Sequence, residues 1–319
     1  MKSLPVLIRR EFWEHRSAFV VLPAVITFFF LAMMSLVFMV AIADIVDMGI
    51  DLDDRINIDM SILLDHHERP VVEQQFSSGN QMAFMLSRLD NMSELRRKEI
   101  VNHGLQTLSV PLVIVLWGVI FFYLLTCLHG ERRDRSILFW KSMPVSDAMI
   151  VISKLVSGLL VVPLVYLLGI AVLQLSALIL LTLASLDTEI SAIETVWGSA
   201  DIVSNWYSYL SAILFYSLWS LPFFAWLLVV SAFARSLPLA WALGVPFALA
   251  VCERIFTDQT VVADWMRSHV IPLGFLTSDH SSFSSLVSRL FSLQMLSAVI
   301  VGAGLVLVGI WFRGKAEEI

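Results

Sequence analysis

The nearest approach to a catalytic motif is the stretch GIWFRGKA at residues 309–316. It matches the first seven positions of a P-loop, whose backbone amides hold phosphate groups. A P-loop follows a strand, opens a helix and needs Ser or Thr after its lysine, whereas here Ala316 follows Lys315 at the end of an apolar run. We therefore interpret the stretch as a helix end with snorkelling cations, and we expect no ATP-hydrolysing site in this chain.

Two groups of polar residues imitate metal sites. A calcium-loop spacing of oxygen ligands occurs at Asp51, Asp53, Asn57 and Asp59. A calcium loop needs Gly at its sixth position and Glu at its twelfth, but Ile56 and Ile62 stand there. The second group comprises Asp65, His66, His67 and Glu68, in which the adjacent histidines would reach one ion awkwardly from a helix. We expect a solvated acidic loop and no metal in this chain.

Other catalytic arrangements are missing from the sequence. It contains no HExxH zinc motif, no GxSxG nucleophile motif and no pair of carboxylates inside an apolar run. Ion-driven transporters usually place ionisable groups at mid-depth in the membrane. The strongly polar residues of the apolar runs are mainly Gln174 and Gln294, with Glu253 and Arg254 near one end. We therefore expect no catalytic residue and no resident cofactor, and an energy source that lies on a partner.

The chain as a whole is strongly apolar. Of the 319 residues, 58% are hydrophobic and 15% are charged, with a mean hydropathy of +0.82. A soluble domain is about one quarter charged, and a bilayer core of about 30 Å needs roughly 20 apolar residues in a helix. We assign six runs as spans: 18–43, 105–128, 155–186, 206–234, 237–251 and 290–312. The composition predicts an all-α polytopic membrane protein with six transmembrane helices, of which 155–312 holds spans three to six.

Lysine and arginine indicate the orientation, because they concentrate in the connections on the cytoplasmic side. If the N-terminus is inside, the inner connections hold 12 Lys and Arg against 7 Asp and Glu, whereas the outer ones hold 9 against 20. The inner connections are also much shorter. We therefore expect both termini, including the tail 313–319, in the cytoplasm, and the chain in a membrane such as the bacterial inner membrane.

Residues 1–17 predict an amphipathic helix at the inner membrane surface. Apolar side chains recur at Leu4, Ile8 and Phe12, which share one helical face. The cations and aromatic residues that mark this helix are Arg9, Arg10, Phe12 and Trp13. A helix of this kind lies in the interface on the side of the anionic lipids. We interpret it as a surface anchor, with direct contact to a partner as the alternative.

The outer connections are acidic, and the first of them is long. Within 44–104, apolar residues between 81 and 103 have helical spacing, so we expect a small helical lobe outside the membrane. This lobe is too small and too polar to form a domain of its own. The remaining outer loops are expected at 187–205 and 252–289.

The connection at 129–154, here called the charged segment, is the most informative inner part. It starts with both signs of charge in five residues and continues with an apolar, aromatic patch before Pro144. This mixture suits a protein contact better than a lipid contact, although a lipid-facing connector is the alternative. The residues that we expect to couple to a partner are Glu131, Arg132, Arg133, Asp134, Arg135, Ser136, Phe139, Trp140 and Lys141.

Two of the apolar runs carry unusual small or polar residues. Ala298, Gly302 and Gly304 give the last run a face for close helix packing. The run 206–234 and the residues around its start carry several serines and tyrosines, among them Ser217 and Tyr216. We interpret both features as helix packing, and the lining of a pathway is the alternative.

Three features together resemble the permease subunits of the ABC-2-type exporter family. LIRREFWEHRS before the first span is similar to the family's amphipathic elbow helix, and the six-span plan with both ends inside covers nearly the whole chain. In the charged segment, the positions that match the family pattern are Glu131, Ser136, Leu138, Pro144 and Lys154. The sequence departs from that pattern at 135–138, where it has Arg-Ser-Ile-Leu and the family often has Gly-Thr-Leu.

The resemblance implies a half-transporter that moves its substrate with energy from a separate ATPase. Two copies would pair as a homodimer, each would dock an ATPase subunit that binds ATP and Mg²⁺, and no nucleic acid would be involved. In the family, the second and fifth spans line the path, which points here to Trp117, Phe121, Leu124, Trp241, Val245 and Leu249. Two other classes stay open: a polytopic membrane enzyme, and a membrane sensor or scaffold that uses its outer lobe.

Overall fold

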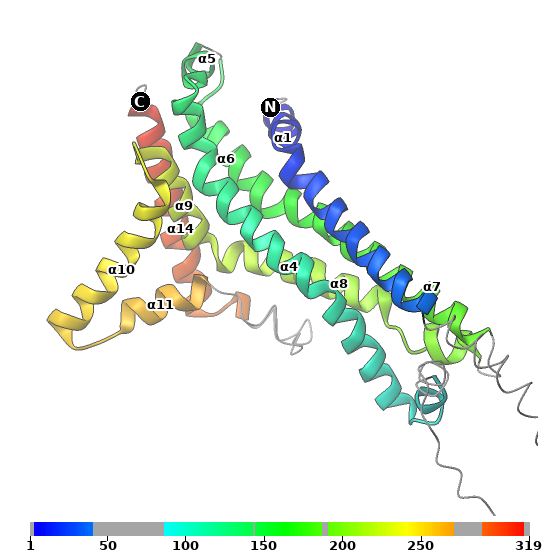
Figure 1. Cartoon of the computed structure of the whole chain (residues 1–319). Helices are drawn as coiled ribbons and strands as arrows, with labels where there is room; N and C mark the ends of the chain where they lie inside the picture. The colour runs from blue at the N-terminus through cyan, green and yellow to red at the C-terminus, as the bar shows by residue number, and fades with distance from the viewer. Residues whose placement is uncertain (1–2, 41–85, 143, 187–190, 271–288, 316–319) are drawn as a thin grey trace, which may run out of the picture. The chain divides into compact units, whose positions relative to one another are not determined.

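The computed structural model describes residues 3–40, 86–142, 144–186, 191–270 and 289–315 (Figure 1). Every regular element within these ranges is a helix, which confirms the predicted all-α class. Most of the lobe predicted at 44–104, including the acidic loop and the His66–His67 pair, lies outside the described residues, as does 271–288.

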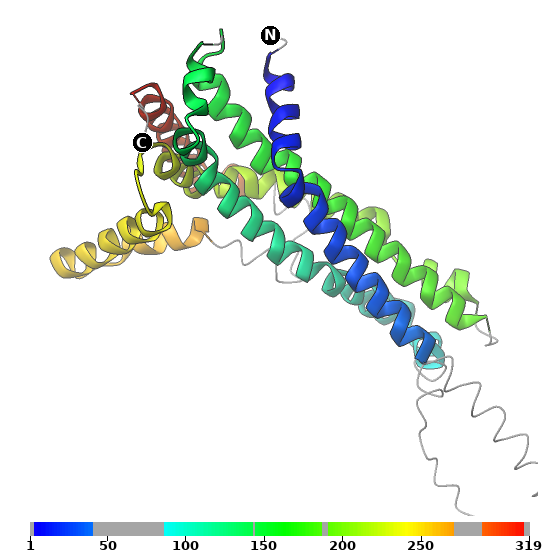
Figure 2. The ribbon, with the colours of Figure 1, turned by 45° about the horizontal axis from the view of Figure 1, so that its top comes forward.

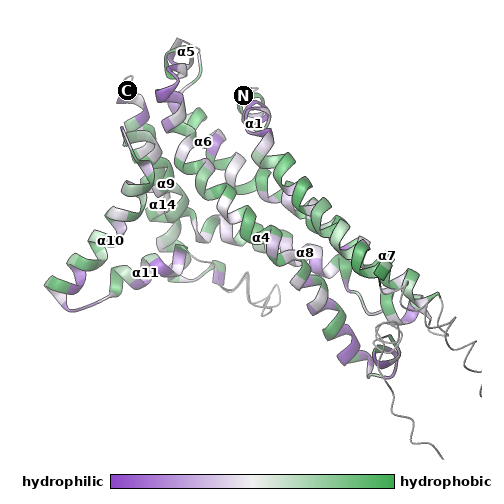
Figure 3. Cartoon of the chain, viewed as in Figure 1, coloured by the Kyte–Doolittle hydropathy of each residue, from purple (hydrophilic) through white to green (hydrophobic). Residues whose placement is uncertain are grey.

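The described part of the chain contains five helices that are long and apolar enough to cross a membrane. They are Ser17–Val40, Glu94–Arg133, Asp147–Ser185, Pro238–Thr257 and Leu293–Lys315. A sixth span is present if Ile193–Trp219 and Leu221–Phe233 together make one broken span. Figure 3 shows the hydrophobic residues that dominate these helices. By helix length and hydropathy, the protein is a polytopic integral membrane protein.

The run 206–234, predicted as one span, is two helices. α8 (Ile202–Trp219) stops before Ser220, and α9 (Leu221–Phe233) continues at an angle of 58° to the helix before it. Pro222 stands in the first turn of α9, where its missing N–H leaves no helical hydrogen bond unmade. In a continuous helix the same proline would clash with the carbonyl four residues earlier. The bend therefore has a local cause in the sequence.

The chain forms two compact units, and each is described by itself. The first contains 1–24, 110–170 and 203–319, and the second contains 25–109 and 171–202. In the first unit, α14 (Leu293–Lys315) packs along α9. α1 (Ser3–Glu14), which Figure 2 shows as a separate helix before the chain enters its first span, packs against α6 (Asp147–Val156). α6 also contacts α14, so three distant parts of the sequence meet there.

A helical hairpin in the same unit consists of α10 (Pro238–Thr257) and α11 (Val261–Val270). Glu253 closes the turn, because its carboxylate accepts hydrogen bonds from the backbone N–H groups of Val262 at 2.7 Å and Ala263 at 2.9 Å. A carboxylate at the start of a helix satisfies amides that have no helical partner. Glu253, which stood out in the sequence as an acid near a span end, is thus a helix cap.

The second unit has its own apolar core. The buried residues of this core are Val101, Leu105, Ala177, Leu178 and Val196. Gln174 is buried beside them, and its side-chain amide donates to the carbonyl of Leu105 at 3.2 Å and to Ser109 Oγ at 3.1 Å. Because its amide is hydrogen-bonded to the neighbouring helix, Gln174 has the role of a packing residue.

The contact between α9 and α14 depends on the absence of a side chain at Gly302. A Cβ atom built there would lie 2.6 Å from Leu221 Cγ, which is closer than real Cβ contacts, and 3.1 Å from Leu221 Cβ, which is a tight contact. A Cβ atom at Gly304 would meet nothing within 4 Å. Of the two glycines predicted to give a packing face, the structure therefore places Gly302 in the contact and Gly304 outside it.

We expect Gly302→Ala to destabilise the protein by about 1–3 kcal/mol, because the added methyl group pushes α14 away from α9. Gly304→Ala is the matched control, and it should be neutral or slightly stabilising, because alanine favours a helix over glycine. Thermal unfolding of the purified protein in detergent measures both. Equal melting temperatures for the two variants would contradict this description of the contact.

Candidate functional site

Three charged side chains from distant parts of the sequence meet in the first unit. Lys154 Nζ lies 3.0 Å from Glu11 Oε1 and 3.0 Å from Glu131 Oε1. The ammonium donates a hydrogen bond to Glu11 Oε1. The exposed fraction is 1% for Lys154, 1% for Glu11 and 5% for Glu131. The ammonium is thus enclosed between two carboxylates, as a buried charge requires. Together with Arg313, these residues are here called the ion cluster.

Arg313 joins the last helix to the ion cluster. Its Nη2 atom lies 3.0 Å from Glu131 Oε2, and its Nη1 atom donates to Asp147 Oδ1 at the start of α6. Arg313 is only 2% exposed. The interpretation of its position as a helix end with snorkelling cations was therefore wrong for this residue, because its two terminal nitrogens pair with carboxylates inside the unit. Lys315 is exposed, and its ammonium lies 4.0 Å from the centre of the Trp311 ring.

Local sequence signals hold the members of the ion cluster in place. Ser146 caps α6, and its hydroxyl accepts a hydrogen bond from the N–H of Met149 at 3.3 Å. Lys154 follows two turns later, on the face of α6 that packs against α1. On α4 (Glu94–Arg133), Tyr123 precedes Glu131 by about two turns and donates a hydrogen bond to Glu11 Oε2 at 3.0 Å. One carboxylate of α1 thus contacts both α4 and α6.

Arg10 connects the ion cluster to an aromatic residue of the charged segment. Its guanidinium carbon lies 3.6 Å from the centre of the Trp140 ring, a cation–π distance. The same side chain pairs with Glu14 at 2.9 Å and approaches Glu131 at 3.7 Å. Trp140 also belongs to a small apolar cluster with Leu7 and Ile150. Apolar and ionic contacts therefore hold α1 against the charged segment together.

The electrostatics of the site favour the ionised form of Glu11. Burial alone would raise the pKa of this carboxyl group, but the cations of Lys154 and Arg10 and the hydrogen bonds from Lys154 and Tyr123 oppose it. The net result is a pKa of Glu11 below its ordinary value. The neighbouring His15 has a pKa lowered mainly by burial. At neutral pH the site therefore contains a charged Glu11 and an uncharged His15.

Burial divides the nine residues that were expected to couple to a partner. Glu131, Arg132 and Trp140 are buried in the unit, and Ser136 is partly buried. The exposed members are Arg133, Asp134, Arg135, Phe139 and Lys141. The last two belong to the short helix α5 (Ser136–Ser142), on which Leu138 is also 53% exposed. The charged segment thus has a buried base and an exposed surface, here called the α5 surface, made of Leu138 and these five exposed residues.

The predicted N-terminal helix forms, as α1, but the face that it buries differs from the predicted apolar stripe. In α1 the stripe of Leu4, Ile8 and Phe12 is only partly buried, whereas Leu7 and Glu11 are buried. Trp13 is 58% exposed, and Arg9 is exposed as well. Glu11 was not among the predicted site residues, because a carboxylate on an amphipathic helix is ordinarily solvated. The available signal was its spacing from Leu4 and Leu7, which puts it on their face.

The residues named as candidate pathway lining have different surroundings. Trp117 stacks on Phe224 at 5.4 Å between ring centres, and Phe121 stacks on Phe223 at 6.1 Å. Leu124 is fully buried. On α10, Trp241 and Leu249 are about half exposed and Val245 is partly buried. The members on α4 thus pack inside the first unit, whereas those on α10 include exposed side chains.

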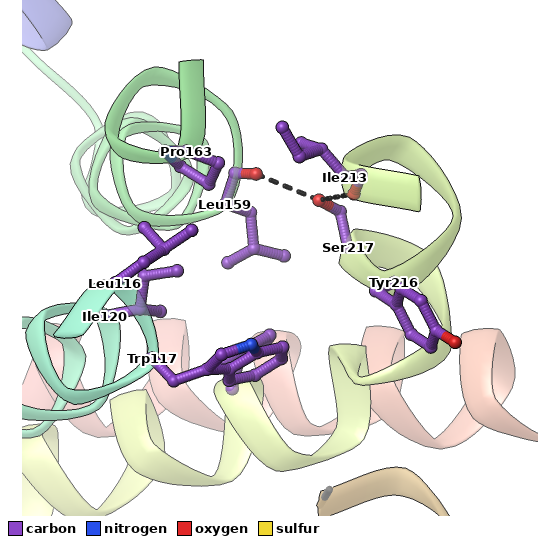
Figure 4. Close-up of a pocket in the computed structure, with 9 residues that line it drawn as sticks. Leu116, Trp117, Ile120, Leu159, Pro163, Ile213, Tyr216 and Ser217 are labelled. Atoms are coloured by element: carbon purple, nitrogen blue, oxygen red, sulfur yellow. Dashed lines mark hydrogen bonds between the residues drawn. The ribbon is translucent and has the colours of Figure 1, made fainter. Parts of the chain in front are cut away.

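A small cavity of about 30 Å³ lies beside Trp117 (Figure 4). Its walls are apolar except for Ser217 and Tyr216 of α8. Pro163 has no N–H to offer to the carbonyl of Leu159, and the Ser217 hydroxyl lies 2.9 Å from that carbonyl and 2.6 Å from the carbonyl of Ile213. The serine thus compensates for a proline in the neighbouring helix, as proline-containing spans require. The cavity is large enough to hold a water molecule.

The site holds charges in fixed positions. Its carboxylates and cations are paired with one another, so the arrangement links α1, α4, α6 and α14 mechanically. It provides no adjacent nucleophile and base within the residues that the structure describes.

Comparison of the chain with protein-family models, with curated proteins and with solved structures finds no match. The chain is therefore shown to be a helical, polytopic membrane protein with a buried ion cluster.

We expect Lys154→Met to destabilise the protein by about 3–5 kcal/mol, because it leaves Glu11 and Glu131 buried without the cation between them. Lys141→Met removes an exposed lysine from the same segment and should change the stability by less than about 0.5 kcal/mol. Thermal or chemical unfolding in detergent measures both variants.

A second variant separates charge from packing. In Lys154→Met combined with Glu11→Gln, one of the two unpaired carboxylates is neutral, so this double variant should be more stable than Lys154→Met alone. If Lys154→Met were as stable to unfolding as Lys141→Met, the ion cluster would not be needed to hold the helices together.

Proposed function

We propose that this chain is the membrane-spanning permease subunit of an ATP-driven exporter of the ABC-2 type that it resembles. Two copies pair, and each docks a separate subunit that binds ATP and Mg²⁺ and hydrolyses the ATP. The observation that carries the proposal is the construction of the charged segment. The α5 surface is exposed, whereas the buried part of the charged segment is joined through Glu131 and the ion cluster to α1, α6 and α14.

This construction suits the transmission of force from a partner. A partner that moves α5 also moves Trp140, which contacts Leu7 and Arg10 of α1. Glu131 lies five residues before α5 begins and is held by Lys154 and Arg313. Because charges paired in a buried site separate only at a high energetic cost, the linked helices move together. An energy-supplying subunit that binds α5 and moves it would therefore shift several helices at once.

The surface chemistry favours a protein partner at this place. The exposed apolar side chains of Leu138 and Phe139 lie next to exposed charges of both signs, such as Arg133 and Asp134. Aromatic residues and arginine are enriched where proteins bind one another. A purely lipid-facing helix would carry cations around an apolar face and little acid.

The charge distribution supports an orientation for the proposed subunit. Lys and Arg are concentrated in the connections on the side of the charged segment, which supports a cytoplasmic position for that side by the positive-inside rule. Both termini then lie in the cytoplasm, and the membrane is the bacterial inner membrane. ATP is available on that side, where the α5 surface would meet its partner.

Co-purification tests the proposal directly. The tagged chain, extracted from its native membrane in mild detergent, should bring down a second chain with a P-loop and ATPase activity. Phe139→Ala should weaken this association at least tenfold, because an interface aromatic residue is lost. Phe256→Ala, which removes an 83% exposed phenylalanine from the far end of α10, is the control and should leave the association unchanged.

Two results would contradict the proposal. One is a pure, folded preparation that contains no ATPase partner. The other is an associated ATPase whose binding and activity are the same for wild type, Phe139→Ala and the charge reversal Arg133→Glu. Thermal unfolding of each variant establishes that it is folded before the result is interpreted.

A further inference from the structure

One buried cation of the first unit has no carboxylate partner. Arg132, at the end of α4, is 6% exposed. Its Nη2 atom donates to the carbonyl of Ala234, and its Nε atom has no hydrogen-bond partner among the residues that the structure describes. The other two buried cations of the unit, Lys154 and Arg313, each lie 3.0 Å from a carboxylate oxygen. Arg132 thus departs from the pairing that buried charges require.

A second arginine increases the positive charge at this place. Arg235 directly follows Ala234, whose carbonyl Arg132 contacts, and the two arginines are close enough for their charges to repel each other. Arg235 is exposed. His129 Nδ1 lies 3.1 Å from the same carbonyl of Ala234. Neither arginine has a carboxylate within 4.0 Å in the described parts of the chain. Two unpaired positive charges side by side are stabilised by an anion.

The backbone nearby adds to the positive field. α10 begins at Pro238, three residues after Arg235, and its axis puts the positive end of the helix dipole there. Helix N-termini bind phosphate and other anions for this reason. The Arg132 guanidinium has five N–H groups, and only one of them donates to the carbonyl of Ala234 at the end of α9.

The position along the helices indicates where the anion comes from. Arg132 lies in the last turn of the candidate span Glu94–Arg133, and Arg235 lies in the short turn between α9 and the candidate span Pro238–Thr257. Residues at the ends of spans lie at the depth of the lipid headgroups. Basic residues at that depth attract anionic lipids.

We propose that Arg132 and Arg235 form a binding site for a phosphate group at the membrane surface. The guanidinium groups of two arginines match the oxygens of one phosphate, because each can donate two parallel hydrogen bonds. The phosphate belongs to the headgroup of an anionic phospholipid or to a soluble phosphate compound. The site does not depend on the proposed transport function, because it requires no ATPase partner.

A simpler role for Arg132 is that it only caps the end of α9. A basic side chain often binds the last carbonyls of a helix. This role accounts for the contact with Ala234, but it gives no reason for the second arginine or for a buried guanidinium that has no carboxylate beside it in the described parts of the chain. The two roles make different predictions for Arg235, which makes no capping contact in the described structure.

The test uses the purified full-length chain in detergent. Its thermal unfolding and its lipid binding, the latter by native mass spectrometry, are measured with phosphatidylglycerol, with phosphatidylcholine and with inorganic phosphate. We expect phosphatidylglycerol or inorganic phosphate to raise the melting temperature and phosphatidylcholine to have a smaller effect. Stabilisation by phosphatidylglycerol alone identifies a lipid headgroup, and equal stabilisation by millimolar inorganic phosphate identifies a soluble phosphate compound.

The variants decide whether the two arginines are responsible. Arg235→Gln, which changes an exposed residue and should leave the fold intact, should weaken binding about fivefold, as expected for one basic residue at a membrane surface. Arg132→Gln should weaken it at least as much. Arg254→Gln removes the same charge from the other end of α10 and is the matched control. Wild-type binding by Arg235→Gln, or no preference of the wild-type chain for either phosphate probe over phosphatidylcholine, would overturn the proposal.

Discussion

A charge that is buried in an apolar protein has to be neutralised by its neighbours, and the first unit of this chain is organised around that constraint. Lys154 is buried away from water, so its charge is neutralised by the carboxylates of Glu11 and Glu131. Glu131 in turn requires Arg313. These ion pairs bring together α1, the end of α4, the last turn of α6 and the end of α14. A buried ion pair need not increase stability over an apolar contact, but it allows only the arrangement in which every member is paired.

The apolar contacts of the unit act on the same helices as the ion cluster. Gly302 allows α14 to approach α9 closely, and Trp140 with Leu7 fixes α1 against the charged segment. The short helix α5 keeps exposed side chains, and the residues beneath it are connected to the neighbouring helices. This combination of a rigid base and an accessible surface is the physical reason for proposing that a partner acts on the membrane helices through α5.

Hydropathy predicted the larger features because they depend on many residues at once. The spans, the α-helical class and a separate N-terminal helix follow from long apolar runs and from periodicity. The ion cluster could not be predicted, because its members lie up to 302 positions apart, between Glu11 and Arg313, and each taken alone is a charged residue near a span end. The bend at Ser220 had a visible signal in Pro222, but prolines also occur inside continuous helices such as α4, which contains Pro111.

The ion cluster couples helices that are distant in the sequence. A double-mutant cycle on Glu131 and Arg313 tests it most directly, because the two residues belong to α4 and α14 and lie 3.0 Å apart. The free energy of unfolding is measured for wild type, Glu131→Gln, Arg313→Met and the double variant. The structure predicts a coupling energy of about 1–3 kcal/mol, with the double variant more stable than the sum of the single effects implies. Additive effects, with a coupling energy near zero, would show that the ion cluster does not couple these two helices.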